Sequence, residues 1–312
     1  MAMATDTPDP GMMRAVRVHP PGSVGDLSVD EVPIPTVSGD EVLVRVHAAA
    51  LTRDELGWPV DRLPAIPSYE LSGTVAEAGI SGFEPGVAVC GMTDFEKDGV
   101  AAEYAAVAGD QLVPVPGGLT HADAAAFPLP ALSAMQGLFD HGRLTGNERV
   151  LIHGGAGAVG AYAVQLAKLH GSYVIATAST SRVEMARRLG ADEVIDHSQS
   201  DFTAIEPVDL VFDAAGGDRL RRSVDVLRPG GRLISVAEDP PMEQARRAGI
   251  EAKWYLVESR RDQLVELASL IDQGRLQVKV YETFHLTEAG AAFARLEEGG
   301  TGKIVLTVLE ES

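Results

Sequence analysis

Three glycines in the middle of the chain have the GxGxxG spacing of a dinucleotide-binding turn. They follow an apolar run over residues 149–153 and precede apolar residues at helical spacing over 161–170. In such a strand–turn–helix segment, glycines allow a tight turn, close approach of a pyrophosphate and close packing of helix on strand. The N–H groups and positive end of the helix would hold the phosphates. We therefore predict nucleotide binding by Gly155, Ala156, Gly157, Ala158, Val159 and Gly160.

The residues after the next strand distinguish between the two nicotinamide dinucleotides. An acidic residue there binds the ribose 2′-hydroxyl of NAD and would repel a 2′-phosphate. After the strand expected over residues 173–177 this chain has hydroxyl side chains and a guanidinium, which can bind a phosphate. The pattern predicts NADPH, bound by Ser179, Thr180, Ser181 and Arg182. The hydroxyl residues could alternatively cap a helix, and Arg182 could be a solvated surface charge.

Short apolar strands alternate with amphipathic helices around the glycine turn. We expect strands over residues 150–153, 173–177, 193–195, 209–213, 232–236 and 253–257, helices over 161–170, 182–189 and 219–227, and a turn at 229–231. This alternation predicts an α/β fold with a doubly wound parallel sheet.

The chain before this region has the pattern of a β domain. We expect short strands over residues 15–19, 27–32, 41–50, 73–78, 88–91, 101–107 and 112–114, separated by turn residues. Closure of such a sheet removes its exposed edges, so a compact barrel-like domain is predicted. Residues 1–12 are expected to form a disordered tail.

Two further stretches complete the predicted domain organisation. Thr120 is expected to cap a helix that runs to Ala126 and is broken by Pro128 and Pro130, followed by a helix over 133–141. Near the C-terminal end we expect helices over 263–271 and over 287–296, the second capped by Thr287, and strands over 278–284 and 303–309. These two strands exceed what a six-stranded sheet needs, so we expect them to return to the β domain. That domain would comprise residues 13–121 and 261–312, with residues 122–260 inserted as the nucleotide-binding domain and a cleft between the two.

The composition excludes several classes of function. The 312 residues carry a net charge of −19, which disfavours nucleic acid and anionic membranes because the long-range field repels phosphates. Cys90 is the only cysteine, which excludes an intrachain disulfide and a multi-cysteine zinc site and is compatible with a reducing compartment. The chain has no signal-peptide pattern and no apolar run approaching about 18 residues. We therefore expect a cytoplasmic protein.

Five segments carry a resemblance to a known family. They are residues 150–160, 189–196, 209–217, 227–233 and 302–306, and they occur in the expected order. From Met13 onward the chain resembles the zinc-free quinone oxidoreductase branch of the medium-chain dehydrogenase/reductase superfamily. The resemblance implies a GroES-like catalytic domain that is discontinuous, an inserted Rossmann domain, NADPH as cofactor, and hydride transfer to a quinone or to the activated C=C bond of an enone.

The resemblance also implies contacts to the nicotinamide half of the cofactor. These would come from the junction of the domains, from the loops after the fourth and fifth strands of the parallel sheet, and from the last of the five segments. The residues concerned are Pro130, Ser133, Ala214, Ala215, Gly216, Val236, Ala237 and Lys303. His197 occupies a place where relatives often have a tyrosine near the adenosine phosphate, and it could equally be an exposed loop histidine.

The resemblance makes the absence of zinc ligands informative. Zinc-dependent alcohol dehydrogenases of the superfamily place a cysteine where this chain has Thr52 and a histidine where it has Tyr69. A tetrahedral zinc site needs Cys, His or carboxylate ligands in number, so we predict no metal. Without a Lewis acid, reduction of a conjugated acceptor is favoured over alcohol oxidation, because negative charge can spread into an enolate or hydroquinone.

The same two positions are the candidates for the group that assists the acceptor. Tyr69 could donate a hydrogen bond to a developing oxyanion, or it could only fill the space of the lost metal. Thr52 is the second candidate, with a turn residue as its alternative interpretation. Asp54, Trp58 and Phe95 are predicted to border the substrate pocket, although the two aromatic residues could be ordinary core. Water could supply the proton.

Three functions remain open at this point. The leading prediction is an NADPH-dependent quinone or enone reductase, and its first alternative is an enoyl reductase of a polyketide or other specialised pathway. The alternative of another class is a non-catalytic NADPH-binding protein of the crystallin type. The strand expected over Lys253–Val257 lies at the end of the parallel sheet, where an apolar edge is usually covered, so we predict a homodimer that pairs these strands.

Overall fold

The computed structural model describes residues 11–53, 55–58, 63–79, 82–299 and 302–309, and these form two compact units. The first unit comprises the described residues up to Leu129, Ser259–Asp272 and those from Val278 onward; the second comprises Pro130–Glu258 and Gln273–Gln277. The first unit therefore consists of sequence from both ends of the chain. It also contains the helix that begins at His121, which the sequence assigned to the nucleotide-binding domain.

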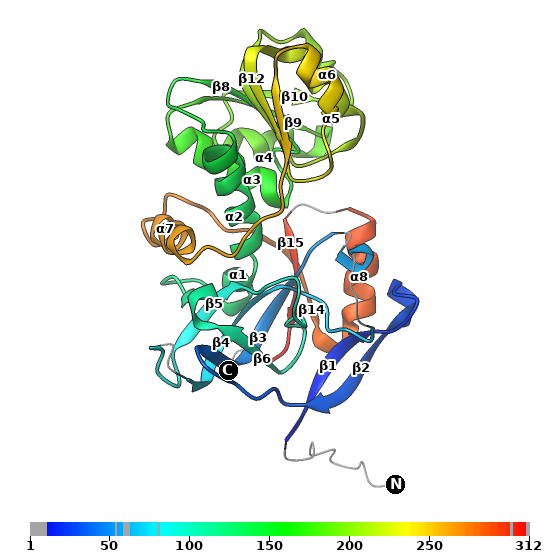
Figure 1. The fold of residues 1–312 in the computed structure, drawn as a ribbon, viewed down its shortest axis with the longest axis vertical. Coiled ribbons are helices and arrows are strands. Elements are labelled where there is room, and N and C mark those ends of the chain that lie inside the picture. Colours follow the sequence, from blue (N-terminus) through cyan, green and yellow to red (C-terminus); the bar gives the residue numbers. More distant parts are fainter. Residues whose placement is uncertain (1–10, 54, 59–62, 80–81, 300–301, 310–312) are drawn as a thin grey trace. The chain divides into compact units, whose positions relative to one another are not determined.

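The first unit is built on a seven-stranded sheet (Figure 1). Its path runs β14-β15-β3-β4-β5-β7, with β6 also paired to β3, and β1 and β2 form a separate antiparallel pair. The C-terminal β15 pairs antiparallel with β3, so it joins the sheet of the first unit. The strands are β1 (Met12–Val18), β2 (Leu27–Pro33), β3 (Glu41–Leu51), β4 (Glu70–Ala78), β5 (Ala88–Met92), β6 (Tyr104–Ala108), β7 (Leu112–Pro114), β14 (Val280–His285) and β15 (Lys303–Thr307).

The core of this unit lies between the sheet and the C-terminal helix α8. Alternating valines of β3 (Val42, Val44 and Val46) are fully buried, while Arg45 is exposed, so one face of the strand faces the core. Phe293 and other apolar residues of α8 pack in the same cluster. The helices of the unit are α1 (His121–Ala125), α7 (Arg261–Asp272) and α8 (Ala289–Glu297), and α2 (Pro128–Met135) begins in it.

The second unit is a parallel sheet of six strands in the order β10-β9-β8-β11-β12-β13 (Figure 1). This order reverses direction between β8 and β11, as in a doubly wound nucleotide-binding fold, and confirms the predicted fold class. The strands are β8 (Arg149–His153), β9 (Tyr173–Ala178), β10 (Glu193–Asp196), β11 (Val208–Asp213), β12 (Leu227–Ser235) and β13 (Glu251–Trp254). The helices are α3 (Ala158–Leu169), α4 (Val183–Arg188), α5 (Gly217–Arg222) and α6 (Met242–Arg247).

The first helix, α1, ends at Ala125, before Pro128 and Pro130, as predicted, but the expectation that the next helix starts at 133 is wrong. Both prolines lie in the first turn of α2, where a residue's N–H has no acceptor within the helix, so the missing donor costs nothing. The N–H of Leu129, between them, donates to the Glu70 carboxylate at 2.9 Å. The helix thus starts five residues before the expected position of 133 and continues as a π turn over Gln136–His141.

Several smaller boundaries also differ from the sequence prediction. Met12 begins β1 although the tail was expected to include it, and α6, which starts directly after Pro241, was not predicted. Residues 229–231, expected as a turn, lie within β12 and bulge out of the ladder, since β11 pairs with Leu227 and next with Arg232. His285 rather than Thr287 caps the turn that leads into α8. No helix among the described residues is long and apolar enough to cross a membrane.

Candidate active site

The glycine turn links β8 to α3 in the second unit. Gly157 is the N-cap of α3, and its N–H donates to the Gly154 carbonyl at 2.8 Å, while the Gly155 N–H donates to the Thr177 carbonyl at 3.0 Å. A Cβ at Gly155 would lie 2.6 Å from the Ala176 Cβ, and one at Gly160 would lie 2.1 Å from the Gly154 carbonyl oxygen. Any other residue at these two positions would therefore push the helix away from the strand.

The turn fits a dinucleotide pyrophosphate. No side chain caps the N-terminus of α3, so the N–H groups of its first turn have no acceptor within the helix. These groups belong to the predicted residues Ala158, Val159 and Gly160, and the helix dipole adds a partial positive charge there. Ala156 is buried beneath the turn. A bound NAD(P)H would supply the hydride, and the chain's part in this unit is to hold its phosphates and sugars.

A buried hydrogen-bond chain supports the turn from below. His153 is fully buried, and its Nδ1 lies 3.1 Å from Thr177 Oγ1 and its Nε2 3.0 Å from Ser223 Oγ. Ser223 Oγ donates to the Arg219 carbonyl at 2.7 Å, so its oxygen accepts from Nε2–H. Thr177 Oγ1 accepts from the Gly154 N–H at 3.3 Å and donates to Nδ1. Burial lowers the pKa of His153 to about 3, so the ring is neutral.

The predicted 2′-phosphate residues gather at the carboxyl end of β9. Ser179 precedes a short 3-10 turn over Thr180–Arg182, in which Ser179 and Ser181 hydroxyls lie 3.5 Å apart. The His197 N–H donates to the Ala178 carbonyl at 3.1 Å, which places His197, an exposed residue, beside this turn. Partial burial and the positive charge of Arg219 lower the pKa of His197.

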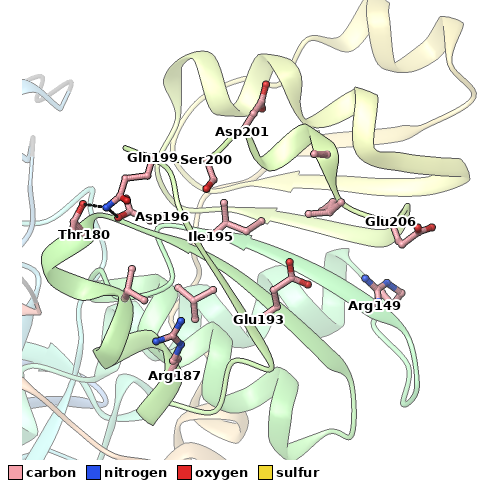
Figure 2. A pocket seen from close by; sticks show the side chains of 14 residues that line it. Arg149, Thr180, Arg187, Glu193, Ile195, Asp196, Gln199, Ser200, Asp201 and Glu206 are labelled. Carbon is pink, nitrogen blue, oxygen red and sulfur yellow. Dashed lines mark hydrogen bonds between the residues drawn. The ribbon is translucent and has the colours of Figure 1, made fainter.

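One acidic residue lies close to this turn and was not considered in the sequence prediction. Figure 2 shows Thr180, Asp196 and Gln199 together on the rim of an open groove of about 700 Å³ that follows β10. Gln199 Nε2 donates to Asp196 at 2.8 Å and to Thr180 Oγ1 at 3.5 Å. The Asp196 carboxylate accepts hydrogen bonds from the Thr180 side chain, from Gln199 and from the Ser198 N–H, and these lower its pKa, but its charge still opposes a phosphate bound at Thr180.

The two loops predicted to contact the nicotinamide are joined by one buried carboxylate. Asp213, at the end of β11, accepts from the N–H groups of Ala215 and Gly216 and from the Ser235 hydroxyl at 3.0 Å. Ser235, at the end of β12, accepts from the Ala237 N–H at 3.2 Å. Burial raises the pKa of Asp213. The pair fixes both loops, which also contain the predicted residues Ala214 and Val236.

The predicted residues Pro130 and Ser133 lie in α2, and both are buried. The phenol of Tyr255 donates to the Ser133 carbonyl within the second unit. A contact of either residue with the nicotinamide stays a prediction.

The predicted residues Thr52 and Lys303 meet in the first unit. Lys303, the first residue of β15, is only 4% exposed, and its ammonium donates to Thr52 Oγ1 at 2.6 Å. It also forms an ion pair with Glu70, which is fully buried at the start of β4. Burial raises the pKa of Glu70, and the Lys303 ammonium opposes this shift. The donors of Lys303 are therefore engaged by two side chains of its own unit.

A second buried carboxylate fixes the loop that carries Thr52. Glu55 accepts from the Thr52 N–H at 2.8 Å through one oxygen and from the Ser68 N–H at 3.0 Å through the other. Ser68 has φ of 71°, in the left-handed region, so the Glu55 bond helps to hold a strained residue next to Tyr69. Burial raises the pKa of Glu55 to about 7.

Three predicted pocket residues form one aromatic cluster. The ring centroids of Trp58 and Tyr69 are 5.9 Å apart, those of Trp58 and Phe95 5.1 Å, and those of Tyr69 and Phe95 5.0 Å. Trp58 and Tyr69, with Glu55, line a cavity of about 420 Å³ whose other walls are mainly apolar. Such a cavity suits a small, flat, apolar molecule. Asp54, also predicted here, lies outside the described residues.

The side chains at this place do not fit a zinc ion. Thr52 and Tyr69 replace the cysteine and histidine of zinc-dependent dehydrogenases, and the neighbouring Lys303 ammonium has three donors and no free lone pair. Across the part of the chain that the structure describes, no three His, Cys, Asp or Glu side chains are gathered as a metal ion requires.

The sequence prediction missed three polar residues that position the site. Glu55 follows Thr52 at the spacing of a capping box, which is a signal that could have identified it. Asp213 ends a parallel strand, where functional residues often lie. His153 was interpreted only as part of a buried strand, and nothing in its spacing indicates its two hydrogen-bond partners.

The comparisons with known proteins agree with one another on the family. Residues 38–117 match the family described as alcohol dehydrogenase GroES-like domain, and residues 189–306 match the one described as zinc-binding dehydrogenase. A 2-methylene-furan-3-one reductase of Solanum lycopersicum is 30% identical over 95% of this chain and 79% of its own length. The spectinabilin polyketide synthase system protein NorB of Streptomyces orinoci is 33% identical over 92% of this chain and 14% of its own length. The structure of a quinone oxidoreductase from Coxiella burnetii superimposes with a TM-score of 0.90 at 30% identity, covering 96% of this chain and all (100%) of that one.

Proposed function

The chain belongs to the medium-chain dehydrogenase/reductase superfamily, in its quinone oxidoreductase-like branch, and we propose that it is an NADPH-dependent reductase of quinones or enones that works without zinc. Oxidoreductases of this superfamily use nicotinamide cofactors. The observation that carries the proposal is the polar group at the position of the lost metal, where Thr52 binds the buried Lys303 ammonium and donates its N–H to Glu55, a residue that lines the aromatic cavity.

The proposed reaction suits this chemistry. Hydride addition to the β-carbon of an enone, or to a quinone, moves a π electron pair onto the carbonyl oxygen, and a proton then completes the reduction. A hydroxyl or phenol that donates a hydrogen bond to this oxygen stabilises the charge as it develops. Thr52 is the residue we assign to this role, and the Tyr69 ring, which forms a wall of the cavity, is the second candidate. The apolar walls formed by Trp58 and its neighbours favour an acceptor without charge.

The preference for NADPH over NADH is also a proposal. The serine and threonine hydroxyls at residues 179–181 and the Arg182 guanidinium support it, whereas Asp196 beside Thr180 opposes it. Arg182 then decides the balance, since a guanidinium–phosphate bond contributes about 1.5–3 kcal/mol. An Arg182→Ala variant should lose roughly 10- to 100-fold in kcat/KM with NADPH and change little with NADH. An equal loss with both cofactors would contradict the assignment.

Two alternatives differ in what the protein does with its cofactor. Similarity to part of a polyketide synthase supports an enoyl reductase, which would reduce enoyl thioesters with the same residues and a differently shaped pocket. A non-catalytic NADPH-binding protein would use the glycine turn alone. The buried Lys303–Glu70 ion pair, which binds Thr52, favours an enzyme. Burying two charges costs free energy, and a threonine that only formed a turn would not need such a pair.

We further propose a cytoplasmic homodimer that binds neither nucleic acid nor membranes. β13 is the edge strand of the parallel sheet, and it ends at Trp254 rather than at the predicted Val257. Trp254 and Leu256 are 43% and 56% exposed, while Tyr255 and Val257 are buried within the unit. Pairing of two β13 edges would cover the exposed side chains. Sedimentation of the chain as a monomer at micromolar concentration would contradict this arrangement.

The experiment that separates these functions is a steady-state assay of NADPH oxidation over quinones, 2-enones and enoyl thioesters. We expect turnover with quinones or 2-enones and a lower kcat/KM with enoyl thioesters. A preference for thioesters would establish the enoyl reductase. Binding of NADPH without turnover of any acceptor would support the non-catalytic protein.

A further inference from the structure

The Lys303 ammonium is a cation held in the interior of the first unit. The side chain is 4% exposed, and the carboxylate that pairs with it, Glu70, is fully buried. Desolvation makes such a pair costly unless its geometry is good and its donors are satisfied. The second acceptor of the ammonium is a neutral one, the Thr52 hydroxyl at 2.6 Å. Besides its ion pair with Glu70, the Lys303 ammonium therefore binds Thr52, a side chain that is predicted to act on the acceptor.

The bond from Lys303 determines what the Thr52 hydroxyl can do. Its oxygen accepts from an ammonium, which has no acceptor to offer in return, so the hydroxyl proton must point to another group. A charge-assisted bond at the oxygen also polarises the O–H bond and strengthens it as a donor. Thr52 is half-buried whereas Lys303 and Glu70 are buried, so Thr52 is the most exposed residue of the chain Glu70–Lys303–Thr52.

The backbone of Thr52 is fixed independently. Glu55 accepts from its N–H at 2.8 Å, and the same carboxylate holds Ser68 in its left-handed conformation. Thr52 is thus held at its backbone by one carboxylate and at its side chain by the ammonium. This preorganisation is what an oxyanion donor needs, because the group then requires no rearrangement during the reaction.

We propose that Lys303 is a positioning residue that orients and polarises the Thr52 hydroxyl, so that Thr52 donates a hydrogen bond to the oxygen of the acceptor. The inference rests on the proposed function and replaces the predicted contact of Lys303 with the nicotinamide. The hydride and its two electrons enter at carbon, the π pair of the acceptor moves to oxygen, the Thr52 hydroxyl stabilises that oxygen, and a solvent proton completes the product. No electron or proton leaves Lys303.

The test removes the cation without leaving a buried charge behind. In Lys303→Met/Glu70→Gln both charges are lost together, so the fold is retained. We expect kcat with a 2-enone to fall about 10²-fold, the size of the loss of one oxyanion donor, while KM for NADPH stays unchanged. Thr52→Val should show the same fall, the triple variant should add little to it, and Thr52→Ser and Lys303→Arg should retain most activity. The matched control, Arg232→Met/Glu148→Gln, removes a partly buried ion pair of the second unit and should retain kcat.

A readout without turnover separates this inference from the proposed function. The probe is 4-nitrophenol, titrated spectroscopically in the presence of NADP⁺, since its phenolate resembles an enolate oxygen. We expect the wild type to bind the phenolate about 10-fold more tightly than Thr52→Val or the Lys303→Met/Glu70→Gln variant does. If the wild type reduces no quinone or enone, the proposed function fails and the titration alone decides the inference. The inference would be overturned if the Lys303→Met/Glu70→Gln variant kept the kcat and the phenolate affinity of the wild type. It would also be overturned if the only change in that variant were in KM for NADPH.

Discussion

The two units contain buried polar networks of opposite character. In the first unit, Glu55, Glu70 and Lys303 bring charge into the interior, and two of them act on Thr52. In the second unit, His153 connects Thr177 and Ser223 through hydrogen bonds that involve no net charge. Both networks support a functional loop, but only the first contains a group that can respond to charge on a substrate.

The difference follows from the charge of what each loop is proposed to meet. The glycine turn would meet phosphates, whose charge is permanent and is matched by N–H groups and a helix end, so a neutral support suffices. The Thr52 loop would meet a carbonyl that becomes negative only during reaction, and a buried cation behind the hydroxyl acts at that moment. We therefore expect pH to change the stability of the two units in opposite directions through these networks. We also expect substitutions in the charged network to cost more stability than those in the neutral one.

The largest loss of stability is expected when only one partner of the Lys303–Glu70 ion pair is removed. Lys303→Met leaves the fully buried Glu70 without its cation and should destabilise the first unit by about 3–5 kcal/mol. Urea unfolding followed by Trp58 fluorescence in a Trp254→Phe background measures this unit, because the chain has one tryptophan in each unit. Addition of Glu70→Gln should restore most of the loss. A cost below about 1 kcal/mol for Lys303→Met would mean that Glu70 is not held as a charge.

A smaller effect is expected from Glu55→Gln. The amide offers one acceptor in place of two, so one of the Thr52 and Ser68 N–H groups is left unpaired at a cost of about 2–3 kcal/mol. The pKa of Glu55 is raised from 4.5 to about 7, so the folded state binds its proton more tightly than the unfolded state. The stabilisation by this group is present below pH 4.5 and is lost as pH rises through 7.

The measurement is the difference in unfolding free energy between wild type and Glu55→Gln at pH 5 and at pH 8, read from Trp58. We expect a smaller difference at pH 8. An equal difference at both pH values would show that Glu55 has an ordinary pKa.

The smallest effect is expected in the neutral network. His153→Leu should destabilise the second unit by about 1–2 kcal/mol, because Thr177 and Ser223 each keep another hydrogen-bond partner. The pKa of His153 is lowered from 6.5 to about 3, so between these values the unfolded chain binds a proton that the folded chain does not. Wild-type stability therefore rises with pH from about 3 to 6.5, opposite to the effect of Glu55.

Unfolding of the second unit in a Trp58→Phe background, followed through Trp254 fluorescence, tests this response. The variant should lose the rise in stability between pH 4 and pH 6.5 and should bind NADPH more weakly, because the Thr177 hydroxyl, which accepts from the Gly154 N–H, loses the ring nitrogen that orients it. If wild type and variant depend on pH alike, the histidine is not buried in neutral form.

The fold could be predicted to a large extent from local pattern. The alternating valines over Val42–Val46 and the glycine spacing at 155–160 are patterns among residues close together in sequence. Each pattern identified its element correctly. Pro128 and Pro130 misled the prediction, because the acceptor that makes a helix start possible there, Glu70, lies 59 residues away from Leu129. The strand expected over Lys253–Val257 ends at Trp254, whose pairing with Ser235 is the last between β12 and β13.

The site was less predictable, for the same physical reason. The sequence suggested Thr52 and Tyr69 from family positions and Trp58 and Phe95 as walls of an apolar pocket, and the structure brings the three aromatic rings together. The partner of Thr52 is Lys303, which is 251 residues distant, and no periodicity relates the two. Long-range polar contacts of this kind depend on the complete fold.

The most direct test of the account is the fate of the hydrogen at C4 of the nicotinamide. The protein is incubated with a 2-enone and with NADPH deuterated on one face or the other, and the product is examined by NMR and mass spectrometry. We predict one deuterium at the β-carbon of the product from one of the two labelled cofactors and none from the other. Reduction of the enone by NADPH without deuterium at the β-carbon of the product from either labelled cofactor would contradict the proposed hydride transfer.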